Sequence, residues 1–244
     1  MRTIIVNGAF GKMGVTTCEA IAQSERYQLI AGLGRNDSLK ASLATHSPDI
    51  VIDFTNAHSV YDNTKVLLMH KVKSVIGASG LTNKQVAELT ELALVNQTGC
   101  IIAPNFSLGA ILMMQFSSVA AAYFSEAEIV ETHHQQKLDA PSGTAIKTAK
   151  LIQEARSTQK NDCVSEELVP GARGAEVSDV NIHSLRLPGY IASQRVMFGG
   201  LGENLTIEHN SISRDCFMPG VLLASDKVMT LNHLVYGLEK LLSS

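Results

Sequence analysis

A glycine-rich segment near the amino terminus limits what this chain can fold into. Residues 8–14 read G-A-F-G-K-M-G and follow an apolar, β-branched run at 3–6, and helical spacing then continues to about Gln23. Strand, glycine loop and helix in this order form the setting of a dinucleotide-binding turn, where glycines let the backbone approach a pyrophosphate. The spacing is G-x-x-G-x-x-G instead of G-x-G-x-x-G, so a tight turn without a ligand stays an alternative.

Short apolar runs and helical spacings alternate from this loop to about residue 105. This alternation predicts an α/β domain with a mostly parallel, doubly wound sheet. Residues 36–48 are few for a complete β-helix-β crossover, so we expect one truncated unit. The expected strands are 27–33, 49–54, 74–76 and 99–103, and the expected helices are 60–69 and a segment that starts with a capping box at Thr82 and continues to about Val95.

The end of the second expected strand bears on the choice of dinucleotide. An NAD-binding site carries an acidic residue there, which binds the ribose 2′-hydroxyl. This chain has Gly34 followed by Arg35. The missing acid removes a repulsion against a 2′-phosphate, and Arg35, together with Lys12 of the glycine loop, can pair with one. The pattern favours NADPH; the alternative is that Arg35 is a solvated surface charge. At a later strand end, residues 77–80 (G-A-S-G) are small enough for a flat ring to lie against the backbone.

From Ser107 onward the pattern changes, and a second, smaller α/β domain with an open sheet is expected. Helices are predicted at 109–124 and 142–156, a strand at 127–132, and a loop at 160–177. Strand-like runs at 179–187, 191–198 and 204–210 predict an antiparallel or mixed sheet. The last segments, 217–225 and 227–242, are predicted to be helices that return to the first domain. We therefore expect a dinucleotide-binding domain at 1–105 and 215–244 and a substrate-binding domain at 106–214.

The stretch 131–150, E-T-H-H-Q-Q-K-L-D-A-P-S-G-T-A-I-K-T-A-K, combines two histidines, a lysine and a helix start. Amides near Gly143 and Thr144 form an anion site at that helix start. Together with a hydride source, these groups suit reduction of an anionic imine or enamine, with the proton coming from His133 or Lys137. Two alternatives stay open at this point. The histidines could be one buried and one solvated imidazole, and a zinc site would need a third ligand that the local sequence does not offer.

Composition narrows the partners and the compartment. The net charge of −3 gives no reason to expect nucleic acid or an anionic membrane. The amino terminus lacks a signal-peptide layout, and the apolar stretch 110–124 is too short and too polar to span a bilayer. Four widely spaced cysteines form no C-x-x-C pair and are expected to be free thiols in a reducing cytoplasm. Their positions are 18, 100, 163 and 216.

Several motifs together resemble those of the 4-hydroxy-tetrahydrodipicolinate reductase (dihydrodipicolinate reductase) family, which acts in the diaminopimelate route to lysine. The resemblance covers nearly the whole chain, and its most specific part is the string H-H-x-x-K-x-D-A-P-S-G-T. The matching segments are G-A-F-G-K-M-G at 8–14, I-D-F-T at 52–55, G-A-S-G at 77–80, A-P-N-F-S at 103–107, E-T-H-H-Q-Q-K-L-D-A-P-S-G-T-A at 131–145, R-L-P-G at 186–189, F-G-G at 198–200 and S-I-S-R-D-C-F-M-P-G at 211–220.

The resemblance implies a Rossmann-like domain, a second domain that assembles a homotetramer, a small dicarboxylate substrate and either NADPH or NADH as cofactor, of which the charge argument favours NADPH. It implies that His133 and Lys137 are catalytic and that His134, Gly143 and Thr144 bind the substrate carboxylates. No metal is expected, because the local sequence lacks a third ligand. The implied cofactor-binding residues are Gly8, Ala9, Phe10, Gly11, Lys12, Met13, Gly77, Ala78, Ser79, Ala103, Pro104, Asn105 and Phe106, to which the charge argument adds Arg35.

Two departures from the family pattern stand out. Gln135-Gln136 occupies a place where members often carry Arg-His, and Gly34 stands where members carry an acid. Another two-domain dehydrogenase is a second interpretation, although a semialdehyde dehydrogenase would need a nucleophilic cysteine in a recognisable motif. A cofactor-sensing protein without catalysis is a third, and it conflicts with the intact His133 and Lys137.

Overall fold

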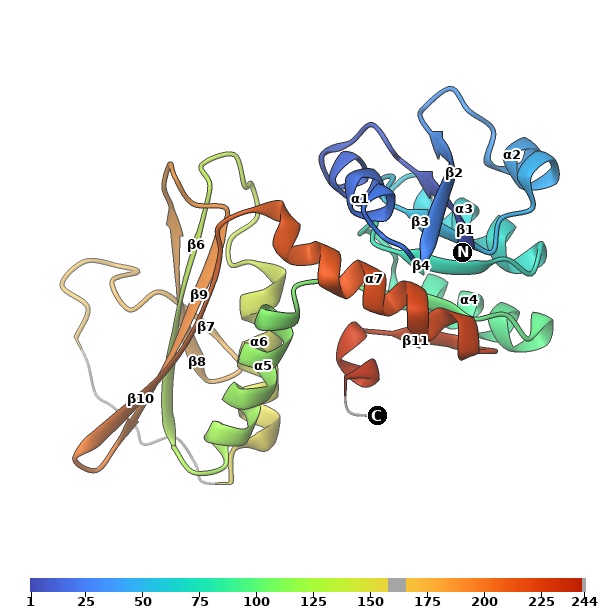
Figure 1. Ribbon diagram of the computed structural model, residues 1–244. Coiled ribbons are helices and arrows are strands. Elements are labelled where there is room, and N and C mark those ends of the chain that lie inside the picture. The colour runs from blue at the N-terminus through green and yellow to red at the C-terminus, as the bar shows by residue number, and fades with distance from the viewer. Residues whose placement is uncertain (158–165, 243–244) are drawn as a thin grey trace. The chain divides into compact units, whose positions relative to one another are not determined.

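The computed structural model describes residues 1–157 and 166–242, and these divide into two compact units (Figure 1). The first unit comprises Met1–Leu108 and Phe217–Ser244, and the second comprises Gly109–Cys216. No helix in the described ranges is long and apolar enough to cross a membrane. Cys18, Cys100 and Cys216 are free thiols, as expected, and Cys163 lies outside the described residues.

A six-stranded parallel sheet forms the centre of the first unit, which confirms the prediction of a doubly wound α/β domain. The strand order is β11-β5-β4-β3-β1-β2. The strands are β1 (Arg2–Asn7), β2 (Tyr27–Leu33), β3 (Ile50–Asp53), β4 (Lys73–Ile76), β5 (Cys100–Ile102) and β11 (Leu234–Tyr236), and the helices are α1 (Lys12–Ala22), α2 (Leu39–His46), α3 (Val60–Met69), α4 (Asn83–Asn96) and α7 (Met218–Lys227).

Helices cover both faces of this sheet, so its central strands are apolar on both sides. One core cluster joins Leu43 of α2, Leu67 of α3 and Leu89 of α4 to strand residues such as Val51. Helices α1 and α7 contact each other and belong to the other layer. All three isoleucine and valine residues at 50–52 in β3 are fully buried, which explains why this strand reads as a continuous apolar run.

The strand order reverses direction at β1, because β2 lies on one side of it and β3 on the other. In open parallel sheets, ligands bind beyond the carboxyl ends of the strands at such a switch point. The glycine loop lies here. Gly8 has φ +85°, and a Cβ on it would come within 2.6 Å of the Phe54 carbonyl oxygen after β3. A Cβ on Gly14 would come within 2.1 Å of the Gly8 oxygen, so both positions require glycine.

A buried carboxylate connects the strand ends at this point. The Asp53 side chain is fully buried and accepts hydrogen bonds at both oxygens. One oxygen accepts from the side-chain amides of Asn7 in β1 and Asn63 in α3, each at 2.9 Å. The other accepts from the backbone N–H of Thr55 at 2.9 Å and from its hydroxyl. Asp53 therefore joins the carboxyl ends of β1 and β3 to the helix that follows.

Two predictions for the first unit were wrong. Residues 36–48 contain a complete crossover with the short helix α2, which begins after Ser38, whose hydroxyl caps the Ala41 amide. Residues 227–242 do not form a helix. They form two 3-10 turns, Val228–Thr230 and Leu238–Leu241, on either side of β11. The apolar run at 234–236 pairs in parallel with β5 instead of continuing a helix, and the positive φ of Gly237 ends that strand.

The second unit is a mixed five-stranded sheet with the order β10-β9-β6-β8-β7, which confirms the expected open sheet. Strands β6 and β8 are parallel, and the other neighbours are antiparallel. Helix α6 contacts β6 and β8, and α5 lies beside it (Figure 1). The elements are α5 (Leu108–Ala121), β6 (Glu126–His133), α6 (Gly143–Ala155), β7 (Ala175–Val177), β8 (Val180–Arg186), β9 (Ala192–Gly200) and β10 (Glu203–Ser211).

The expected loop at 160–177 is only partly described, because residues 160–165 lie outside the described part of the chain. Its last three residues, Ala175–Val177, form the edge strand β7, so the prediction of a loop was wrong there. This strand is too short to be recognised from its own sequence. Antiparallel pairing with β8 determines it.

We predict that Asp53→Asn lowers the free energy of unfolding by about 2 to 3 kcal/mol, because the new amide would face donors that now bind a carboxylate oxygen. Urea unfolding measures the difference. The matched control is Glu91→Gln, since Glu91 is exposed on α4 and its neutralisation should change stability by less than about 0.5 kcal/mol. Equal stability of the two variants would contradict the structural role of Asp53.

Candidate functional site

Three of the segments expected to bind the cofactor lie at one edge of the first sheet. Residues 8–13 follow β1, residues 77–79 follow β4, and residues 103–106 follow β5. All three strands are parallel, so these segments emerge at their shared carboxyl edge. The first-turn amides of α1 are open to an anion, because its N-cap is Gly11 and no side chain caps it.

The space next to Gly77 is taken up by side chains of the chain itself. A Cβ on Gly77 would lie 2.2 Å from the Phe54 ring and 2.8 Å from the Phe106 ring. These two rings meet edge to face, with centroids 5.7 Å apart. Gly77 thus makes room for an aromatic pair of the chain itself, whereas the sequence led us to expect room for a flat ring of a ligand. Ala78 and Ser79 follow Gly77 in the loop.

The turn after β2 contains a carboxylate that sequence reasoning missed. The Asp37 side chain accepts a hydrogen bond from the Gly34 amide at 2.7 Å. Gly34 itself faces the ring of Phe10, which a Cβ would approach to 2.8 Å. The turn therefore presents an acid, Asp37, and a cation, Arg35, both exposed. The sequence signal for this turn is an Asp three residues after the glycine that follows the strand, since an Asp side chain can bond a backbone group three residues before it.

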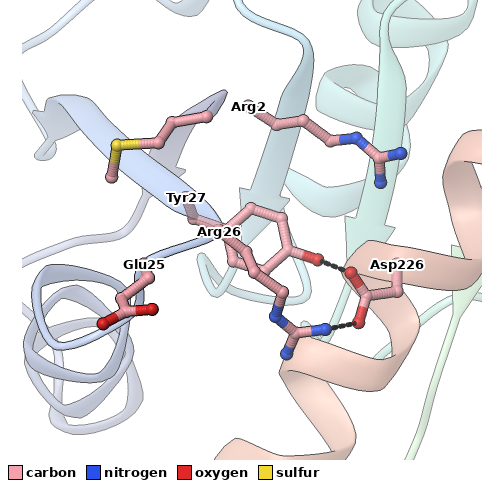
Figure 2. Close-up of a pocket in the computed structure, with 6 residues that line it drawn as sticks. Arg2, Glu25, Arg26, Tyr27 and Asp226 are labelled. Carbon is pink, nitrogen blue, oxygen red and sulfur yellow. Dashed lines mark hydrogen bonds and ion pairs between the residues drawn. The ribbon is translucent and has the colours of Figure 1, made fainter.

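A surface pocket of the first unit lies at the opposite edge of the sheet, where β1 and β2 begin (Figure 2). Two of its charged groups are paired with each other: Asp226 of α7 accepts hydrogen bonds from Arg26 and also from the Tyr27 hydroxyl. Burial and the bond to Asp226 raise the pKa of the Tyr27 phenol. These contacts hold α7 against the start of β2, at the end of the sheet opposite the glycine loop. The remaining lining residues are Met1, Arg2 and Glu25.

The second unit carries its candidate chemistry between β6 and α6. Strand β6 ends at His133, and His134 lies outside it, so the chain leaves regular strand geometry between the two histidines. The Nδ1 atom of His134 is buried and has no hydrogen-bond partner in the described part of the chain. Among those same residues, no three His, Cys, Asp or Glu side chains gather into a group that could hold a metal ion.

Glu131 lies at the centre of this region, and sequence reasoning gave it no role. Its side chain is fully buried in β6 and binds His133 Nδ1 at 2.5 Å. Arg186 of β8 donates to both of its carboxylate oxygens, at 3.0 and 3.1 Å. Burial raises the pKa of the Glu131 carboxyl, but hydrogen bonds from His133, Arg186 and Ser184 outweigh burial and hold the pKa at about 2. The carboxylate is therefore ionised at neutral pH.

Lys137 is held by a neighbouring acid. Its ammonium binds both carboxylate oxygens of Asp139, at 2.7 and 2.8 Å. The Lys137 ammonium is the main reason that the pKa of the Asp139 carboxyl is lowered. Arg186 also donates to the Asp139 carbonyl oxygen at 2.6 Å, which connects this pair to Glu131. Arg186 of β8 therefore links the Lys137–Asp139 pair in the loop after β6 to Glu131 in the strand.

Helix α6 begins as predicted. Ser142 is its N-cap, and the Ser142 hydroxyl accepts from the Ala145 amide at 3.2 Å. The amides of Gly143 and Thr144 lie in the first turn, where a helix offers no carbonyl partner. A Cβ on Gly143 would meet nothing within 4 Å, so open space adjoins this helix start. Ala145, Ala149 and Ile152 form an apolar stripe along this helix, and all three are fully buried.

Models of two protein-family regions match nearly the whole chain. Residues 2–106 match the amino-terminal region of dihydrodipicolinate reductase, and residues 109–242 match its carboxyl-terminal region. A 4-hydroxy-tetrahydrodipicolinate reductase of Legionella pneumophila is 56% identical over 243 residues, which cover 99% of this chain and 100% of that protein. The protein of the same name in Coxiella burnetii is 46% identical over 239 residues, 98% of both chains.

A solved structure agrees with these matches. The dipicolinate-bound dihydrodipicolinate reductase of Paenisporosarcina sp. TG-14 has a TM-score of 0.90 and 42% sequence identity, and the similarity covers 98% of this chain and 99% of that one. The biliverdin reductase of Synechocystis sp. PCC 6803 reaches a TM-score of 0.61 at 13% identity, over 98% of this chain and 93% of that one, which is a likeness of fold alone. Similarity in sequence and in structure thus extends over both units. The chain belongs to the dihydrodipicolinate reductase family.

Proposed function

We propose that this chain reduces 4-hydroxy-tetrahydrodipicolinate to tetrahydrodipicolinate, with loss of water and with NAD(P)H as the reductant. The observation that carries the proposal is the full-length identity of 46 to 56% to proteins named for this reaction. The reaction belongs to the diaminopimelate route to lysine. Family membership also makes the chain an oxidoreductase, which argues against a cofactor sensor without catalysis.

The two units have separate roles in this proposal. The first binds the dinucleotide at the carboxyl edge of its parallel sheet, where the uncapped start of α1 suits a pyrophosphate. The second binds the dicarboxylate substrate. That the Paenisporosarcina relative is described as dipicolinate-bound supports a small dicarboxylate ligand. When bound, the reduced nicotinamide supplies the hydride that adds at C4 after the 4-hydroxyl has left as water.

Side chains and amides of the second unit hold the substrate and supply the proton. The Gly143 and Thr144 amides and His134 bind its carboxylates, and the open space beside Gly143 leaves room for one of them. Lys137 or His133 then protonates the enamine that hydride addition leaves behind, at the carbon next to the C=N carbon, so that the C=N bond is restored. Since Lys137 is already paired with Asp139, an anionic substrate competes with that carboxylate for the ammonium. Gln135 and Gln136 contribute no charge to this competition.

We further propose that the chain assembles a homotetramer through the open sheet of the second unit. Apolar side chains on or next to its strands are exposed to solvent, as on a face that another subunit covers. They include Leu185, Leu187, Tyr190 and Leu205.

The function is tested by following NAD(P)H oxidation in the presence of dihydrodipicolinate synthase and its substrates, which generate the labile substrate in place. We expect oxidation that depends on the synthase. Absence of oxidation with either nucleotide would contradict the proposed reaction, and oxidation with other amino-acid-derived carbonyl compounds but not with this one would favour a different dehydrogenase.

Lys137→Ala should lower kcat about 100-fold or more, because it removes a proton donor from the chemical step. Binding of NADPH should be unchanged, since its proposed contacts lie in the other unit; fluorescence titration of the nucleotide measures this. The control is Lys150→Ala, an exposed lysine of α6, which should keep wild-type kcat. A wild-type kcat for Lys137→Ala would exclude it as the acid.

The turn after β2 should set the choice between the two nucleotides, and we propose a preference for NADPH through Arg35. Asp37 opposes this preference, because its carboxylate lies in the same turn and repels a 2′-phosphate. Arg35→Ala should lower the ratio of kcat/KM for NADPH to that for NADH about 10-fold, and Asp37→Asn should raise it. NADH is the internal control, since it lacks the 2′-phosphate. If the ratio of kcat/KM values is unchanged in both variants, the turn does not discriminate between nucleotides with and without the 2′-phosphate.

A further inference from the structure

We propose that Glu131 is a positioning residue, which fixes the proton-bearing nitrogen of His133 and anchors both the Lys137 loop and the start of helix α6. The proposal rests on the proposed function for its catalytic consequences. The contacts on which it is based all lie within the second unit, and they are present whatever reaction the chain catalyses. Glu131 is not among the site residues that the sequence predicted.

The first contact orients an imidazole. Glu131 and His133 stand two residues apart on β6, so their side chains share one face of the strand. An ionised carboxylate can only accept hydrogen bonds, so the 2.5 Å contact requires the proton on His133 Nδ1. Nε2 is then the nitrogen that is free to exchange a proton with a ligand. The carboxylate of Glu131 is the group in this contact that selects the tautomer with its proton on Nδ1.

The second contact secures the loop that carries Lys137. Arg186 pairs with Glu131 through two nitrogens, a bidentate geometry that fixes the guanidinium plane. One of those nitrogens also donates to the Asp139 carbonyl oxygen at 2.6 Å. The carboxylate of Asp139 in turn holds the Lys137 ammonium. The position of the lysine therefore depends on a buried carboxylate in the strand, through Arg186.

The third contact fixes the helix start. The Ser142 amide donates to Glu131 Oε1 at 3.3 Å, although Ser142 lies 11 residues later in the chain. Ser142 is the N-cap, and the amides of Gly143 and Thr144 follow directly. One buried side chain thus contacts the imidazole, the arginine that secures the lysine loop, and the first residue of the anion-binding helix.

The test compares Glu131→Gln with Glu128→Gln. Glu128 is a matched control, because it lies on the same strand and also binds a histidine and an arginine, His183 at 2.9 Å and Arg173. Glu131→Gln should lower kcat about 100-fold, since an amide can donate to Nδ1 and favour the other tautomer. KM for the dicarboxylate should rise, and NADPH affinity should stay unchanged. Glu128→Gln should keep kcat within about twofold.

Nitrogen-15 NMR of the histidine side chains reads the His133 tautomer in the folded wild-type protein, so this readout does not depend on whether a variant folds. In the wild-type protein, the signal that disappears in His133→Gln should be that of a ring with its proton on Nδ1, and it should change in Glu131→Gln. This measurement needs no substrate, so it tests the proposal even if the proposed reaction is wrong. A wild-type signal with the proton on Nε2, or a folded Glu131→Gln variant with wild-type kcat, would overturn it.

Discussion

A buried carboxylate is stable only if donors from the protein replace its hydration, and each unit of this chain depends on one such group. In the first unit, Asp53 accepts from Asn7, Thr55 and Asn63 and so holds together the strand ends at the switch point of the sheet. In the second, Glu131 does the same for the region between β6 and α6. Because removal of any donor would leave a charge unsatisfied, the backbone around both carboxylates has little freedom. The loops proposed to bind ligands start from these fixed points.

Charges in the second unit alternate along a path from the interior to the surface. Glu131 is fully buried, Arg186 is largely buried, and Asp139 is mostly exposed. Each opposite charge lowers the cost of the next, which explains why an arginine and a carboxylate can remain ionised under a loop. Lys137, which pairs with Asp139, is partly exposed. The buried carboxylate and the lysine proposed to be catalytic thus belong to one connected set of groups.

Local signals were sufficient wherever an element is determined by its own residues. The strand at 27–33 and the helix at 60–69 have the predicted bounds, and the capping box of Thr82 and Gln85 is formed. Two of the three errors, at 175–177 and at 227–242, fall where strand pairing overrides local spacing. Residues 227–242 have helical apolar spacing, yet β5 offers an unpaired edge, and the run at 234–236 completes the sheet instead. A three-residue strand contributes too little local preference to be recognised without its partner.

The sequence by itself determined the family, the succession of most elements and the histidine–lysine–helix stretch, because these are carried by contiguous residues and local periodicity. Only the tertiary structure decided which distant groups meet. Arg186 follows Glu131 by 55 residues, and parallel pairing of β6 with β8 brings the two strand ends together, with His133 opposite Arg186. Likewise, only the hydrogen bond that the Gly34 amide donates to Asp37 shows that this carboxylate closes the turn after β2. Contacts of this kind depend on strand register and side-chain direction, and neither can be read from the local sequence around the residues that make them.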